Sequence, residues 1–171
     1  MNEIKSKNLN RIYDRVEKDK YGNDIFIEMK ERVFQASDAR KVTQISYKKL
    51  NDWDSKGILP YKFKNEFGWK YFDGYDIICL KILCLLRDKG ATLPELKKSY
   101  THLKSNLFIK KAIKDSLKLD LFIGTDLENG FVAIPEKEMD KFVNSINDQP
   151  YLIFRFNPIV QDFLRQLKIK L

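Results

Sequence analysis

The chain has 171 residues, of which 43% are hydrophobic and 33% charged, and it carries a formal net charge of +8 at pH 7. This composition excludes an intrinsically disordered chain, and the length allows one or two domains. The charge is uneven, because residues 35–105 hold 14 basic and 8 acidic side chains, whereas residues 1–34 and 106–171 each have a net charge of +1. The middle segment is therefore the part expected to meet nucleic acid, a membrane surface or another acidic partner.

The N-terminal segment lacks the apolar core of a secretory signal. The most apolar run, residues 77–86, is interrupted by Lys81 and is too short to span a bilayer. We therefore expect a cytoplasmic protein without a membrane partner.

Residues 1–33 are predicted to form a helical extension. The first 18 residues carry four apolar side chains at helical spacing: Leu9, Ile12, Tyr13 and Val16. Residues 21–24 are expected to end that helix. Residues 25–34 fit either a strand that starts at Ile25 or a second helix, since short apolar runs do not distinguish the two. Packing onto the following domain and binding of a partner are both open roles for this extension.

Residues 36–57 predict two short helices joined by a tight turn. Ser37 is the predicted N-cap of the first helix and Ser46 that of the second, which Gly57 ends. In the second helix Leu50 and Trp53 should face inward. Two helices with this connection are typical of a helix-turn-helix, in which the outward side chains of the second helix reach base edges. The candidate DNA contacts of this helix are Ser46, Tyr47, Lys48, Lys49 and Asn51.

Residues 61–72 alternate apolar or aromatic with basic side chains around a turn at Gly68. This pattern predicts a β-hairpin that would act as a wing, with cations on phosphate and aromatic rings against sugar or the core. Its candidate contacts are Lys62, Lys64, Trp69, Lys70 and Tyr71. The predicted core side chains of the unit are Trp53, Leu59, Phe72 and Leu86. A helix that ends at Gly90 should follow, and then another with Thr92 as N-cap and Pro94 in its first turn.

Three segments in this order, LNDWDSKGILP, GWKYF and LLRDKGATLPELKK, resemble the mercury-resistance regulator (MerR) family of winged helix-turn-helix proteins over residues 34–98. Asn51 and Asp54 stand where that family has an arginine and a glutamate, and Trp69, Lys70 and Phe72 replace its wing residues. The resemblance implies a transcription regulator that binds double-stranded DNA. We expect a homodimer, because a single helix and wing contact only about half a turn of duplex. We expect no enzymatic activity, because the sequence has no catalytic constellation.

Beyond this unit, residues 99–117 predict a helical connector. Its apolar stripe of Ile109, Ile113 and Leu117 makes it the only candidate dimerisation helix that we find in the sequence. Residues 118–171 predict a small α+β module of order ββαβα, which could serve dimerisation, a protein partner or a small effector. The expected fold is thus mainly α with small β parts. Dimer contacts are expected from residues 97–171.

The sequence offers no catalytic, cofactor or metal site. Cys79 and Cys84 lie five residues apart on a predicted helix, so they point about 140° apart and are expected to be apolar fillers. His102 has no ligand partner at metal spacing, and the acidic side chains after residue 118 fit solvated faces and caps. Sequence-specific DNA binding in transcription regulation is the favoured function. The alternatives are an architectural DNA-binding protein of a mobile element, such as an excisionase or partition factor, and a protein-interaction module.

Overall fold

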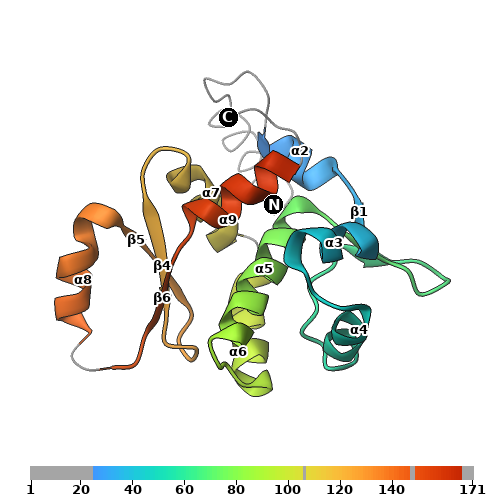
Figure 1. The fold of residues 1–171 in the computed structure, drawn as a ribbon, viewed down its shortest axis with the longest axis horizontal. Coiled ribbons are helices and arrows are strands. Elements are labelled where there is room, and N and C mark those ends of the chain that lie inside the picture. Colours follow the sequence, from blue (N-terminus) through green and yellow to red (C-terminus); the bar gives the residue numbers. More distant parts are fainter. Residues whose placement is uncertain (1–24, 106, 147–148, 167–171) are drawn as a thin grey trace, which may run out of the picture.

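The computed structural model describes residues 25–105, 107–146 and 149–166. The helix predicted over the first 18 residues and the turn after it lie outside these residues. The described chain is mainly helical with two small sheets, as predicted (Figure 1). Its first half contains α2 (Ile25–Glu31), β1 (Phe34–Gln35), α3 (Ala36–Thr43), α4 (Tyr47–Ser55), β2 (Phe63–Lys64), β3 (Lys70–Phe72), α5 (Gly74–Asp88) and α6 (Leu93–Leu103). Its second half contains α7 (Leu107–Ser116), β4 (Leu121–Thr125), β5 (Phe131–Pro135), a 3₁₀ turn (Glu136–Glu138), α8 (Met139–Ser145), β6 (Leu152–Arg155) and α9 (Asn157–Gln166).

The ambiguous stretch before the first domain is a helix followed by a short strand. In α2, Ile25, Phe26 and Met29 are buried against the rest of the molecule. Strand β1 then pairs antiparallel with β3, so the first sheet has the order β1-β3-β2. The helix alternative is therefore correct, and the strand that would start at Ile25 is not formed, because the only strand in this described stretch begins at Phe34.

The start of α3 differs from the prediction. The N-cap is Gln35 and not Ser37, because the helix begins two residues earlier. Asp38 closes this end by accepting a hydrogen bond from the Gln35 backbone N–H at 3.1 Å. The Asp38 carboxylate, at the third helical position, thus stabilises a helix start after Gln35, whereas the prediction placed the start after Ser37 because of its hydroxyl.

Four other predicted helix ends are confirmed. The Oγ of Ser46 accepts from the Lys49 N–H at 3.1 Å, and Thr92 caps α6 with Pro94 in the first turn. Gly57 and Gly90 follow α4 and α5 with φ of 68° and 101°, a backbone conformation that glycine adopts without steric cost. These local signals set the lengths of α4 and α5.

Helix α5 is the centre of the molecule. Eleven of its residues are buried, and it contacts α2, α3, α6, α7 and α9 (Figure 1). One continuous apolar core therefore joins both halves of the described chain. Trp53, Leu59, Phe72 and Leu86 all belong to it, as predicted.

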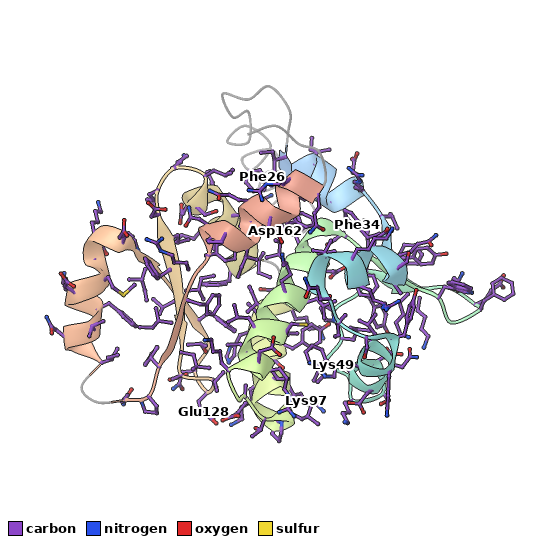
Figure 2. The ribbon with its side chains drawn as sticks, viewed as in Figure 1. Phe26, Phe34, Lys49, Lys97, Glu128 and Asp162 are labelled. Atoms are coloured by element: carbon purple, nitrogen blue, oxygen red, sulfur yellow. The ribbon has the colours of Figure 1, made fainter. Side chains whose placement is uncertain are left out.

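The second half follows the predicted order of strands and helices, and its sheet has the order β5-β4-β6. Helix α9 returns to the first half, where the Phe163 ring lies 5.9 Å from the Phe34 ring, and Lys81 forms an ion pair with Asp162 (Figure 2). The apolar stripe of α7 is also used within the chain, since Ile109 and Ile113 are both 0% exposed. That stripe is consequently not available as the dimerisation surface that the sequence suggested.

Candidate nucleic-acid interface

The turn between α3 and α4 is fixed by hydrogen bonds that involve three side chains. Gln44 adopts a left-handed conformation with φ of 59°, which reverses the chain after α3. The Thr43 hydroxyl donates to the Ala39 carbonyl at 2.7 Å, and the Arg40 Nε donates to the Ile45 carbonyl at 3.3 Å. With the Ser46 cap, these contacts hold the first turn of α4 in one orientation.

Helix α4 separates its faces as predicted. Leu50 and Trp53 are 2% and 1% exposed, whereas Tyr47, Lys48 and Asn51 face solvent. Lys49 is half-buried, and its Nζ lies 5.2 Å from the centre of the Trp53 ring. The side chains available to a ligand are therefore Tyr47, Lys48 and Asn51, while Lys49 lies against the core.

A residue outside the predicted set orients Tyr47. The guanidinium carbon of Arg40 lies 3.9 Å from the centre of the Tyr47 ring, close enough for a strong cation–π contact. Arg40 also donates a hydrogen bond to the Ile45 carbonyl in the turn. It is therefore held in place and sets a permanent positive charge beside the exposed start of α4. No motif identified Arg40, although a basic residue in the last turn of the first helix was visible in the sequence.

The hairpin, residues 62–72, stands beside α4 and projects from the body of the molecule (Figure 1). Its predicted cations have different surroundings. The Lys62 Nζ donates to the backbone carbonyl of Lys30 at 2.6 Å, so this lysine ties the hairpin to the end of α2. The other two cations of the hairpin turn toward α4.

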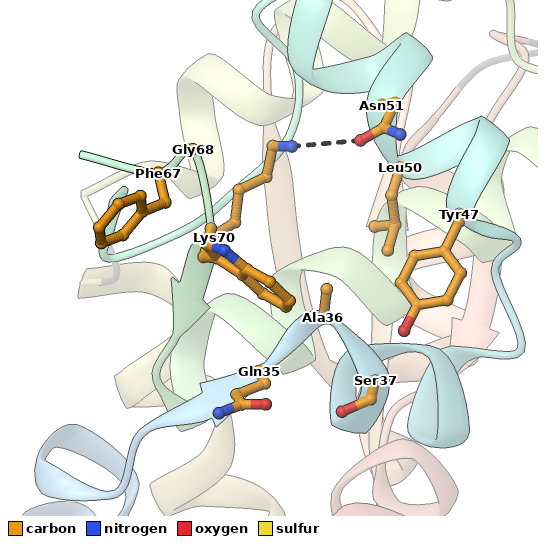
Figure 3. Close-up of a pocket in the computed structure, with 10 residues that line it drawn as sticks. Gln35, Ala36, Ser37, Tyr47, Leu50, Asn51, Phe67, Gly68 and Lys70 are labelled. Carbon is orange, nitrogen blue, oxygen red and sulfur yellow. Dashed lines mark hydrogen bonds between the residues drawn. The ribbon is translucent and has the colours of Figure 1, made fainter. Parts of the chain in front are cut away.

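Asp54 on α4 holds both of these cations. The Nζ atoms of Lys64 and Lys70 each lie 3.3 Å from Asp54 Oδ2, and Lys70 also donates to Asn51 Oδ1 at 3.2 Å (Figure 3). The Lys70 side chain is only 12% exposed and that of Asp54 18%. One carboxylate thus fixes the hairpin to α4 and offsets part of the charge that the sequence assigned to phosphate binding.

The aromatic side chains of the hairpin fall into two groups. The rings of Phe63 and Tyr71 stack across the two strands, with centres 4.7 Å apart and planes 17° apart. Phe67 and Trp69 are instead 78% and 61% exposed. Tyr71 therefore stabilises the hairpin, whereas Trp69 and Phe67, which was not predicted, face outward.

A groove of about 350 Å³ runs between α3, α4 and the hairpin (Figure 3). It brings together members of both predicted groups of contacts, Tyr47 and Asn51 on one wall with Trp69 and Lys70 on the other. Gln35 and Ser37 at the start of α3 complete it. Polar groups and aromatic rings face each other across a channel that is open to solvent, an arrangement that suits a sugar-phosphate strand.

A second group of titratable side chains lies where β3 runs into α5. Asp73 Oδ1 accepts from the Asp76 N–H at 2.9 Å, and Asp76 Oδ2 accepts from the Asp73 N–H at 3.0 Å. Burial raises the pKa of Asp73, and burial together with the Asp73 charge raises the pKa of Asp76 to about 7. This pair caps α5 and joins the hairpin to the core.

The remaining titratable candidates have structural surroundings. Cys79 and Cys84 are buried, and burial raises the pKa of both thiols, that of Cys84 to about 12. His102 is exposed and its Nε2 lies 3.3 Å from the Glu128 carbonyl oxygen. Within the described residues, no group of three or more His, Cys, Asp or Glu side chains could hold a metal ion.

Residues 34–103 match the model of a family described as MerR HTH family regulatory protein. This region is a MerR-like helix-turn-helix domain. The match confirms the resemblance seen in the sequence and extends it to the end of α6. It supports a DNA-binding transcription regulator and places the first sheet, α4 and the groove within one MerR-like domain.

A search among curated proteins found no match to the chain. In the part of the chain that the structure describes, no helix has both the length and the hydropathy required to cross a bilayer.

Proposed function

We propose that this protein is a sequence-specific transcription regulator that binds double-stranded DNA through its MerR-like domain. In this proposal α4 enters the major groove, and the hairpin contacts the adjacent backbone. The observation that carries the proposal is the groove between them, because it is lined by exposed polar and aromatic side chains from both elements.

The exposed face of α4 supports a role in reading bases. Lys48 and Asn51 can each offer hydrogen-bond donors to base edges, and Asn51 can also accept. Among the described residues, Lys48 has no ion-pair or hydrogen-bond partner and is exposed. Asn51 Oδ1 accepts a hydrogen bond from Lys70 Nζ, which leaves the Asn51 amide NH₂ available to donate to a ligand. We therefore assign base contacts to Lys48 and Asn51 first.

The hairpin and the start of α3 support a role in holding the backbone. Lys70 and Trp69 flank the groove on one side, and the Tyr47 ring with the nearby Arg40 flanks it on the other. A phosphate entering this channel would meet Lys70 and the Ser37 hydroxyl. Such contacts fix the register of α4 in the major groove without reading sequence themselves.

We further propose that the protein binds DNA as a homodimer. A single helix and hairpin contact about half a turn of duplex, and tight specific sites generally require two half-sites one helical turn apart. The dimer contacts are assigned to residues 97–171, where the exposed large apolar side chains are Leu107, Leu119, Val143 and Ile153. Light scattering of the full chain, free and on its site, tests this; a monomer mass in both states would contradict it.

Selection of bound sequences from a random duplex pool tests the main proposal. The full chain should enrich one sequence, recovered as two related half-sites if the dimer is correct. Lys48→Ala and Asn51→Ala should lose the enrichment. Lys141→Ala is the matched control, since Lys141 is an exposed lysine on α8, far from α4 (Figure 1). A pool that stays random with the unaltered chain would overturn the proposal.

A further inference from the structure

Phe67 is the most exposed large apolar side chain among the described residues, with 78% of its surface accessible. It lies at the tip of the hairpin, across the groove from Tyr47 (Figure 3). An exposed phenylalanine leaves a large apolar surface in water, which is unfavourable unless a partner covers it.

The turn that carries Phe67 is rigid. The Asn65 side-chain oxygen accepts hydrogen bonds from the backbone N–H groups of Phe67 at 3.1 Å and Trp69 at 2.9 Å. The Gly68 N–H donates to the Asn65 carbonyl at 3.0 Å, and Gly68 has the positive φ of 82° that this turn needs. Asn65 thus fixes the backbone from which the ring projects, and little conformational entropy is lost when the backbone of this tip binds.

The other aromatic rings of the hairpin have neighbours. Phe63 and Tyr71 stack on each other, and Trp69 lines the groove. Phe67 has no ring or cation partner within the described residues. Among the aromatic rings of the hairpin, Phe67 is therefore the one that no other described side chain covers.

The charge of the hairpin favours a polyanion as the partner. Residues 62–72 contain three lysines and one glutamate, and Lys64 on the strand before the turn remains 43% exposed. A protein surface would need acidic side chains around an apolar pocket, whereas duplex DNA offers phosphates on both sides of a stack of apolar base faces.

We propose that Phe67 inserts between two base pairs from the minor groove, next to the major-groove segment that α4 reads, and kinks the duplex there. This inference rests on the proposed function and adds a DNA deformation to it. Rigid apolar side chains on minor-groove binders unstack a base step in this way and gain contact surface from the bend. Flexible pyrimidine–purine steps would be preferred at that position, so the ring would also contribute to sequence preference.

The test uses the duplex selected for the full chain, with 2-aminopurine replacing one adenine at a time and a fluorophore pair on the two ends. Binding should raise the 2-aminopurine fluorescence at one step beside the half-site and shorten the end-to-end distance. Phe67→Ala should abolish both signals and weaken binding about tenfold, the scale of one lost ring–base contact. Phe67→Leu, which keeps an apolar wedge, should retain part of both signals. Ile27→Ala is the matched control, because Ile27 is an apolar side chain 48% exposed on α2, outside both the groove and the residues assigned to the dimer, and should change neither signal.

The outcomes separate this inference from the proposed function. If the unaltered chain binds its selected duplex without unstacking any step, or if Phe67→Ala keeps the kink, the wedge is wrong and the regulator proposal stands. If Phe67→Ala changes the mass measured by light scattering and leaves the fluorescence intact, the ring covers a second copy of the chain, which also overturns the wedge. If the unaltered chain binds no duplex, both proposals fail together.

Discussion

The hairpin of the first sheet and the second sheet use their aromatic side chains differently. The first sheet, β1-β3-β2, leaves Phe67 and Trp69 in solvent on its hairpin. In the second sheet, β5-β4-β6, Phe131 packs against Phe108, and Tyr151 just before β6 packs edge-on against Phe142. Ring packing in the second sheet stabilises the chain itself, whereas the exposed rings of the hairpin are those that we propose to contact a partner.

The junctions between these sheets and the helices that follow also differ. β3 runs into α5 through the buried carboxyl pair of Asp73 and Asp76. β6 runs into α9 through Asn157, whose amide accepts from the Leu121 N–H at 2.7 Å and donates to the carbonyls of Ser116 and Leu119. A neutral amide keeps its hydrogen bonds at any ordinary pH, whereas a carboxyl pair does not. The first junction should therefore be sensitive to pH and the second should not.

The largest expected effect is on stability, and it distinguishes buried aromatic residues from exposed ones. Phe156, which follows β6, is 0% exposed, so Phe156→Ala should lower the free energy of unfolding by about 3–5 kcal/mol. Phe67→Ala should change it by less than about 0.5 kcal/mol, since the ring is already in water. Urea unfolding followed by circular dichroism measures both. Equal losses for the two variants would break the comparison.

The next effect is a pH dependence of the first junction. The pKa of Asp76 is raised from 3.8 to about 7, so between these values the folded state holds a proton that the unfolded state has released. The free energy of unfolding should therefore fall as the pH rises from about 4 to about 7, by on the order of 4 kcal/mol, and level off above that.

Asp76→Asn should flatten this slope, because the amide keeps an oxygen for the Asp73 N–H and does not titrate. Asp140→Asn on α8 is the control and should retain the slope of the unaltered chain. Urea unfolding at about pH 5 and about pH 8 gives the comparison. An Asp76→Asn variant with the same slope as the unaltered chain would show that Asp76 is not the group that titrates.

A smaller effect concerns α4. Lys48→Ala should weaken binding to the selected duplex by about 1–3 kcal/mol and binding to a scrambled duplex much less, because a base contact is lost. Lys70→Ala should weaken both duplexes more evenly and reduce the salt slope by about one unit. Fluorescence anisotropy at several salt concentrations distinguishes them. Loss of discrimination with Lys70→Ala alone would reverse the roles assigned to helix and hairpin.

The smallest effect comes from Asp54. Asp54→Asn keeps an acceptor for Lys64 and Lys70 but removes the charge that offsets theirs. Affinity for scrambled duplex should rise a few-fold, because one carboxylate no longer offsets the lysine charges that attract phosphate, and affinity for the selected duplex should rise less. The ratio of the two affinities should therefore fall. A ratio that stays the same or rises would show that Asp54 only positions the hairpin. Asp52→Asn on the same helix is the control, since Asp52 pairs with Lys56 instead.

The sequence predicted the features that local rules determine. The cap at Ser46, the turn at Gly68 and the inward positions Leu50 and Trp53 each depend on a few neighbouring residues, and all are present. Local rules also failed at one helix end. The start of α3 was predicted at Ser37, but the Asp38 carboxylate accepts from the Gln35 N–H and the helix begins after Gln35.

Contacts between residues far apart in the sequence could not be predicted from local patterns. Lys62 bonds a carbonyl 32 residues away, and Lys70 meets Asp54 on another element. Both lysines looked free in the sequence because a charge pattern shows which residues are basic and not what they bind. The α7 stripe was similarly assigned to a dimer, although helices of the same chain cover Ile109 and Ile113.

The central claim is that the MerR-like domain reads a specific duplex sequence. The most direct measurement is the affinity of the full chain for its selected duplex and for a scrambled duplex of the same composition, at matched salt. We expect the specific affinity to be at least about 10³-fold higher, with Lys48→Ala reducing that ratio by about tenfold or more and Lys141→Ala leaving it unchanged. Equal affinity for the two duplexes would contradict it.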